Sequence, residues 1–136
     1  MKPGGRLLNH QISRLHLPPK AIRSFIDAYV FPDGELAPVG TTVTLLEEAG
    51  FEVRDVHALR EHYAKTLRAW VANLEAGWST ATRLAGSGRA RVWRLYMAAS
   101  ALAFERAQIG VNQVLAVKTH RNGASEMAAT RAAYAA

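Results

Sequence analysis

The apolar positions of the chain fall into short extended stretches and longer helical ones. Residues 6–12 form a compact apolar run, and residues 51–56 alternate apolar and polar side chains, so both stretches predict β-strands. Residues 111–117 predict a third, strongly apolar strand. Between residues 41 and 49 apolar side chains recur at helical spacing, and Gly50 follows where a left-handed helix cap is expected.

Two long helices are predicted in the second half of the chain. The first ends near residues 86–88, and the second runs from about 89 to 108 and is closed by Gly110. Prolines break regular structure at residues 17–20 and mark a turn at 32–34. The apolar face of the first helix carries Leu67, Trp70, Val71, Leu74 and Trp78, and that of the second carries Val92, Leu95, Tyr96, Ala99, Leu102 and Ala103.

The predicted order is strand, loop, helix, strand, helix, helix, strand, which is typical of an α/β layer. Three strands are few, because a mean sheet has about five or six. The first strand reads as an interior strand, yet no helix precedes it to cover either face. We therefore expect an incomplete α/β sheet that is part of a larger domain, spanning residues 1–122. Residues 123–136 are expected to be a flexible Ala-rich tail, either frayed helix or disordered.

Composition narrows the function classes. The chain has 136 residues, enough for one core, and no cysteine, which excludes disulfides, thiolate nucleophiles and cysteine-ligated metals. The five histidines show no metal-ligand spacing, so no zinc site is expected. No apolar stretch suits a membrane span or a secretory signal, so we expect a cytoplasmic protein. The net charge of +6 favours an anionic partner, either a lipid surface or, ranked lower because no nucleic-acid-binding motif is present, DNA or RNA.

Four blocks stand out between residues 6 and 118. They are residues 8–12 (LNHQI), residues 25–36 (FIDAYVFPDGEL), residues 48–53 with 62–70 (EAGFEV and HYAKTLRAW), and residues 96–104 with 113–115 (YMAASALAF and QVL). In order, spacing and residue type they resemble blocks of the cyclopropane-fatty-acyl-phospholipid synthase family, which includes the mycolic acid cyclopropane synthases. The family patterns are L-x-H-x-I, FI-x-x-Y-(I/V)-FP-(D/G)-GEL, AGFEV followed by HYA-x-TL-x-x-W, and the last helix and strand.

The resemblance implies the C-terminal half of a Rossmann-like class I methyltransferase fold that depends on S-adenosyl-L-methionine (SAM). In that fold the cofactor lies beside a glycine-rich loop that follows a strand and opens a helix. Neither residues 4–5 nor residues 86–88 have this context, and the family's upstream catalytic cysteine and glutamate have no counterpart here. We therefore expect the chain to be inactive alone, either as one half of a split enzyme with a separate SAM-binding half or as a truncated remnant.

The implied reaction transfers a methyl group from SAM to a cis double bond of a phospholipid acyl chain, and proton loss then closes a cyclopropane ring. In the family a bound bicarbonate is thought to act as the base. By motif position the resemblance assigns its binding to His10, to the backbone amide of Ile12 and to Tyr63. It assigns the acyl channel to Leu67, Tyr96 and Ser100. Without the resemblance, His10 would be interpreted as a structural histidine and Tyr63 as an ordinary half-buried aromatic residue.

A basic cluster leaves a second hypothesis open. Arg83, Arg89, Arg91 and Arg94 form either a solvated face or a docking surface for anionic phospholipid headgroups. In the second case the chain is a non-catalytic basic module that binds a lipid surface, or a partner protein through an exposed sheet edge. Under either hypothesis the positive charge favours peripheral association with a membrane.

Overall fold

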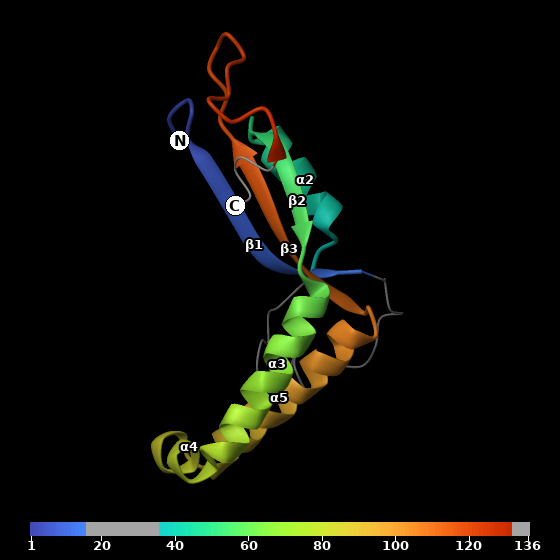
Figure 1. Cartoon of the computed structure of the whole chain (residues 1–136), viewed down its shortest axis with the longest axis vertical. Helices are drawn as coiled ribbons and strands as arrows, with labels where there is room; N and C mark the ends of the chain where they lie inside the picture. The colour runs from blue at the N-terminus through green and yellow to red at the C-terminus, as the bar shows by residue number, and fades with distance from the viewer. Residues whose placement is uncertain (16–35, 132–136) are drawn as a thin grey trace. The chain divides into compact units, whose positions relative to one another are not determined.

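The computed structural model describes residues 1–15 and 36–131, in two compact units. The first unit consists of Met1–Ser13, Ala37–Ala58 and Val111–Ala136, and the second of Arg14–Leu36 and Leu59–Gly110. The elements in chain order are β1 (Arg6–Arg14), α2 (Val39–Glu48), β2 (Glu52–Ala58), α3 (Arg60–Ala76), α4 (Trp78–Ala85), α5 (Ser87–Glu105) and β3 (Ile109–Val117) (Figure 1). The predicted break at 17–20, the predicted turn at 32–34 and the motif block before Leu36 lie outside the described residues.

The strands form a three-stranded sheet in the order β1-β3-β2. β2 pairs antiparallel with β3, from Glu52 opposite Val117 to Ala58 opposite Asn112. Backbone hydrogen bonds between residues 4–5 and Lys118 join the start of β1 to the end of β3, so β1 is also antiparallel to β3. The apolar strand β3 is therefore central. β1, predicted as interior, lies at an edge of the sheet formed by the described residues, and its exposure alternates along its length.

The predicted helix, glycine cap and strand between residues 41 and 56 are confirmed. Gly50 follows α2 with φ +76° and donates its N–H to the carbonyl of Glu47 at 2.8 Å. The Nζ atom of Lys118 donates to the carbonyls of Ala49 and Gly50 at 3.2 and 2.8 Å. A cation at these carbonyls stabilises the end of the helix and ties it to the end of β3.

In the second unit α3 lies along α5, and α4 packs against α5 where α3 ends and α5 begins (Figure 1). The prediction of one uninterrupted helix from Leu67 through Trp78 is wrong, because the helix ends at Ala76 and α4 begins after Gly77. Gly77 is the C-cap of α3 and the N-cap of α4, and its N–H donates to the carbonyl of Asn73. A glycine disfavours the helix interior by about 1 kcal/mol relative to alanine, which is the local reason for the break.

The predicted end of the last helix is also wrong. α5 starts at Ser87 and ends at Glu105, and Gly110 is a buried residue of β3 rather than a helix cap. The cap role falls to Ala107, which has φ +54° and donates its N–H to the carbonyl of Phe104 at 3.1 Å. Alanine rarely adopts this conformation, so the helix end carries no sequence signal of the usual kind.

The apolar faces of the two long helices differ in part from the predicted ones. Trp70, Leu95 and Leu102 were placed on them, but their side chains are 49%, 52% and 40% exposed. The buried positions are the small or central residues Ala64, Leu67, Ala90, Ser100, Ala101 and Phe104. Among the described helices, none is both long enough and apolar enough to cross a membrane.

Candidate active site

His10 and Ile12 lie two positions apart on β1, so their side chains project from the same face of the sheet. His10 is exposed and Ile12 is half-buried. The Nδ1 atom of His10 lies 3.2 Å from the Nε2 atom of Gln113, which belongs to the neighbouring strand β3. Gln113 belongs to the fourth motif block, but only His10 was assigned a role from its motif. The signal that could have found Gln113 is a pair of polar residues at 112–113 inside an apolar strand.

The backbone N–H of Ile12 points away from β3. Leu15 donates its N–H to the carbonyl of Gln108 at 3.3 Å, on the side of β3. N–H groups alternate in direction along a strand, so the N–H of Ile12, three positions earlier, is directed to the opposite side of β1. The direction of this main-chain donor is consistent with the role that the motif predicts for Ile12.

Polar side chains on the other face fix the register of β1. Asn112 donates through Nδ2 to the Oγ atom of Ser13 at 2.6 Å, and the two side chains are buried. Gln11 donates to the hydroxyl of Thr42 on α2. Buried polar groups are costly when their partners are lost, so the bond between Asn112 and Ser13 favours a single register of β1 against β3. That register places His10 beside Gln113.

The remaining predicted site residues belong to the helical unit. Tyr63 lies in the first turn of α3, is half-buried, and has its ring centroid 5.8 Å from that of Phe104. Leu67, one turn later, is 4% exposed. On α5, Ser100 is 5% exposed, and half-buried Tyr96 packs edge-on against Trp93 at 5.4 Å. The structure thus groups His10 with Ile12 in the first unit, and the other four predicted residues on the paired helices of the second.

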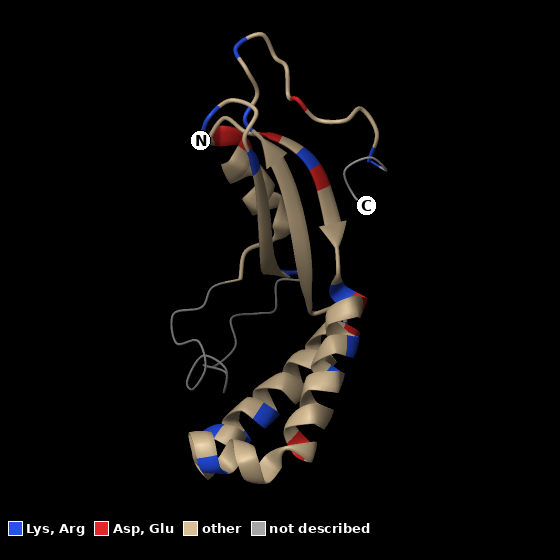
Figure 2. Cartoon of the chain, turned by 60° about the vertical axis from the view of Figure 1, so that its left-hand side comes forward, with Lys and Arg blue, Asp and Glu red and all other residues tan. Residues whose placement is uncertain are grey.

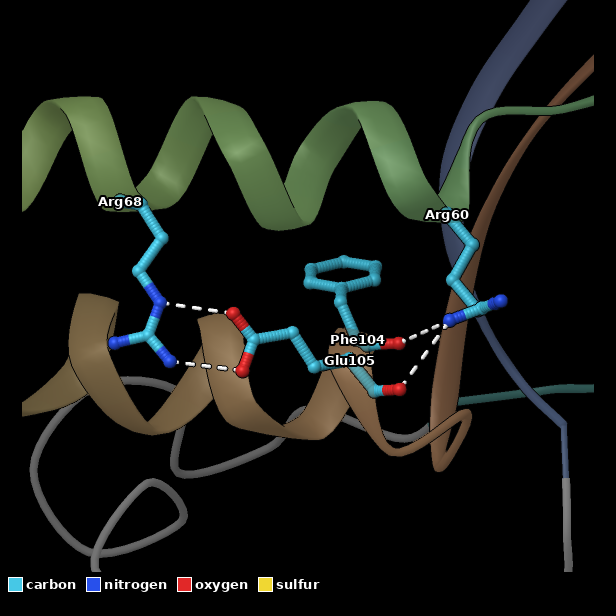
Figure 3. Close-up of polar contacts among 4 residues, drawn as sticks. All are labelled: Arg60, Arg68, Phe104 and Glu105. Carbon is cyan, nitrogen blue, oxygen red and sulfur yellow. Dashed lines mark hydrogen bonds and ion pairs between the residues drawn. The ribbon is translucent and has the colours of Figure 1, made fainter.

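Two arginines join α3 to the end of α5 (Figure 3). Arg68 donates through Nε and Nη2 to the two carboxylate oxygens of Glu105, each at 2.8 Å. Arg60 donates through Nη1 to the carbonyl of Phe104 at 2.7 Å. A positive charge at this place is favourable, because the C-terminal end of a helix carries partial negative charge. Arg60, Arg68 and Glu105 also line a depression of about 590 Å³, together with Glu61, Ala64 and Lys65. Nothing in the sequence spacing predicts these links, because the partners are 37 and 44 residues apart.

The ion pair gives the second unit a dependence on pH. The hydrogen bond from Arg68 is the main reason that the pKa of Glu105 lies below its ordinary value. The stabilisation is therefore complete above the carboxyl pKa of the unfolded chain and is lost as the pH falls through the lower pKa of the folded chain. We expect the Glu105→Gln variant to lose less stability than the unmodified chain when the pH is lowered. Thermal unfolding across a pH series measures this difference.

The matched control for this change is Glu48→Gln, which removes an exposed carboxylate in the first unit. The control is expected to keep the pH dependence of the unmodified chain. Equal pH dependence in all three proteins would show that the pair of Arg68 and Glu105 contributes nothing to folding, as is common for exposed ion pairs.

Comparison with known proteins identifies the family. The family model described as mycolic acid cyclopropane synthetase matches residues 1–114. The chain belongs to this family. Two curated relatives of this chain are named probable fatty acid methyltransferases. The one from Pseudomonas putida is 42% identical over 135 residues, which is 96% of this chain and 34% of the relative. The one from Mycobacterium tuberculosis is 44% identical over 124 residues, which is 90% of this chain and 29% of the relative.

Solved structures of the mycolic acid cyclopropane synthetase family have the same fold. The cyclopropane synthase MmaA2 from Mycobacterium tuberculosis superposes with a TM-score of 0.77 at 26% identity, covering 85% of this chain and 45% of that chain. The mycolic acid cyclopropane synthase CmaA1, complexed with SAH and CTAB, gives 0.72 at 30% identity, covering 82% and 44%. The predicted α/β methyltransferase fold is confirmed. The chain spans about a third of the length of the curated relatives, which is consistent with the predicted C-terminal part.

SAM is the cofactor that the family implies, but the described residues do not fit it by themselves. Within 1–15 and 36–131, no strand is followed by a glycine-rich loop that opens a helix. Gly4, with φ +75°, precedes β1, and a Cβ there would lie 2.7 Å from the Oε2 atom of Glu126. Gly4 therefore leaves room for the side chain of Glu126 in the segment after β3. Over the same residues, no group of three histidine, aspartate or glutamate side chains could hold a metal ion.

Proposed function

We propose that the chain forms the acyl-chain side of a SAM-dependent lipid methyltransferase that acts on unsaturated phospholipid acyl chains, and that it requires a separate SAM-binding half for activity. The observation that carries this proposal is the family match over residues 1–114, which contains the motif positions of His10 and Tyr63. The relatives named fatty acid methyltransferases support an acyl chain as the substrate.

The proposed roles follow from the chemistry of each group. An imidazole, a main-chain N–H and a phenol can each donate one hydrogen bond to an anion such as bicarbonate, and we assign these donors to His10, Ile12 and Tyr63. We assign the acyl channel to Leu67, Tyr96 and Ser100. Leu67 on α3 and Ser100 on α5 are buried. Their burial supports this assignment, because an acyl chain requires surroundings shielded from water.

A chimeric enzyme tests this proposal. The full chain replaces the matching segment of the Pseudomonas putida relative, to which it is 42% identical over 135 residues. We expect the chimera to methylate unsaturated phospholipids with SAM, measured by transfer of a labelled methyl group. His10→Ala and Tyr63→Phe in the chimera are expected to lower the rate about a hundredfold each, the usual effect of removing one donor to a reacting anion.

The matched control is His57→Ala, which removes an exposed histidine of the same sheet to which no catalytic role is assigned. It is expected to leave the rate unchanged. A folded chimera without activity would contradict the proposed function. An active chimera that tolerates His10→Ala would contradict the role of His10.

Binding of an anionic lipid surface is a second proposed function, which the charge of the helical unit favours. Residues 76–104 contain four arginines and no lysine, aspartate or glutamate. The arginines are Arg83, Arg89, Arg91 and Arg94, all exposed, and we call them the arginine surface. Basic positions gather around α4 and the start of α5 (Figure 2). This charge complements phosphate headgroups, each nearby arginine contributing about 1 kcal/mol.

Apolar side chains accompany the arginine surface. Leu84 on α4 is 77% exposed, and Trp93 on α5 is 44% exposed. Exposed leucine and tryptophan beside arginine are typical of helices that lie in the membrane interface. Arg94 is engaged in part, since its Nε atom lies 3.3 Å from the Oε1 atom of Glu75 and its guanidinium lies over the ring of Trp78 at 5.7 Å. The other three arginines are therefore expected to carry most of the attraction.

A further inference from the structure

Gln113 lies in a row of polar residues across the sheet. Its direct partner on β2 is His57, and on its other side the Nδ1 atom of His10 on β1 lies 3.2 Å from its Nε2 atom. Gln113 is half-buried, whereas its apolar neighbours Val111 and Val114 on β3 are buried. The backbone ladder fixes the main chain of Gln113 on the central strand, and from there its carboxamide reaches the ring of His10.

The contact with Gln113 favours one of the two positions for the proton on the ring of His10. An amide nitrogen can only donate a hydrogen bond, so the Nδ1 atom that faces it must accept. The neutral imidazole then carries its proton on Nε2, at the other side of the ring. An N–H on that side can donate to an anion, whereas a bare nitrogen there would direct its lone pair at the negative charge.

We propose that Gln113 is a positioning residue that holds His10 in the tautomer protonated at Nε2. The consequence for an anionic ligand rests on the proposed function, in which His10 donates to bicarbonate. In this role Gln113 acts through the ring of His10. The same reasoning predicts what a carboxylate would do at this position, since a carboxylate only accepts and would draw the proton to Nδ1.

Nitrogen-15 NMR of the histidine rings tests the proposal on the full chain. Spectra are recorded where the rings are neutral, and the His10 and His57 signals are assigned with His10→Asn and His57→Asn. In the unmodified chain, we expect the Nε2 signal of His10 at the shift of a protonated nitrogen and its Nδ1 signal at that of a bare nitrogen. Gln113→Glu is expected to move the proton toward Nδ1, and the two shifts should approach or exchange.

Gln108→Glu is the matched control, because it makes the same substitution at an exposed position outside the sheet row. It is expected to leave the His10 signals in place, and backbone amide spectra confirm that each variant keeps the fold. Protonation of His10 at Nδ1 in the unmodified chain would overturn the proposal. So would a Gln113→Glu variant that is folded and shows the unmodified tautomer.

A titration with sodium bicarbonate, against sodium chloride at equal ionic strength and pH, separates this proposal from the proposed function. We expect the His10 Nε2 signal to shift with bicarbonate and to shift less in Gln113→Glu. If the tautomer is as proposed and bicarbonate has no effect on it, His10 does not bind the anion in this chain by itself, and the positioning role of Gln113 stands. If the proton lies on Nδ1, the positioning role is wrong, whatever bicarbonate does.

Discussion

Phe104→Ala is expected to lower the free energy of unfolding of the helical unit by about 3–5 kcal/mol, the usual cost of removing a buried aromatic ring. Phe104 is 1% exposed and its ring packs against that of Tyr63 at 5.8 Å. Its removal leaves a cavity between α3 and the end of α5, beside the carbonyl that binds Arg60. Because the net stability of a domain is about 5–15 kcal/mol, this loss is a large fraction of the total. Urea unfolding followed by circular dichroism measures it.

Leu84→Ala is the matched control for the removal of Phe104. The side chain of Leu84 is 77% exposed, so its truncation is expected to change stability by less than about 0.5 kcal/mol. A smaller loss for Phe104→Ala than for Leu84→Ala would show that Phe104 does not hold the two helices together. Tyr63→Phe provides a second comparison, since it keeps the aromatic contact with Phe104 and removes only the hydroxyl.

Local patterns predicted the elements well where the determining residues are neighbours in sequence. The cap at Gly50 is one case, because helix, left-handed glycine and strand follow one another within a few residues. The two errors about helix ends had different causes. Ala107 adopts a left-handed conformation that glycine usually takes, and Gly77 separates two helices although the apolar spacing continues across it. The spacing of apolar residues predicts which face of a helix is buried, but it does not show whether the helix continues without a break.

The candidate site was predictable only as far as its motifs extend. The sequence places His10 on a strand and Tyr63 at a helix start, and the structure confirms both elements. His10 lies in the middle of β1, however, and not at the predicted strand end. Their roles in catalysis remain predictions. The contact of His10 with Gln113 joins residues that are 103 positions apart, and that of Ser13 with Asn112 residues that are 99 apart. Such pairs follow from strand register, which a single sequence without a hairpin turn between the strands does not specify.

Replacing the arginine surface by glutamine is expected to weaken binding to anionic vesicles by roughly a hundredfold to a thousandfold at about 0.1 M salt. The change is Arg83→Gln, Arg89→Gln, Arg91→Gln and Arg94→Gln together. Each arginine near an anionic surface contributes about 1 kcal/mol, and 1.4 kcal/mol corresponds to a factor of ten in affinity. Co-sedimentation with phosphatidylglycerol vesicles, compared with phosphatidylcholine vesicles, measures the effect. Thermal unfolding shows whether the loss of the contact between Arg94 and Glu75 changes the fold.

Net charge alone could also explain such a loss, and a second set of four substitutions separates the two causes. Arg6→Gln, Arg106→Gln, Arg121→Gln and Arg131→Gln remove four exposed positive charges outside residues 76–104, so both variants fall from a net charge of +6 to +2. If the arginine surface docks on lipid, the second set weakens binding far less than the first, because contributions fall off within a Debye length of about 8–10 Å. Equal losses would show that the chain is attracted as a whole and that α4 and α5 form no docking surface. Binding that persists in both variants would assign the interaction to exposed apolar residues such as Leu84 and Trp93 instead.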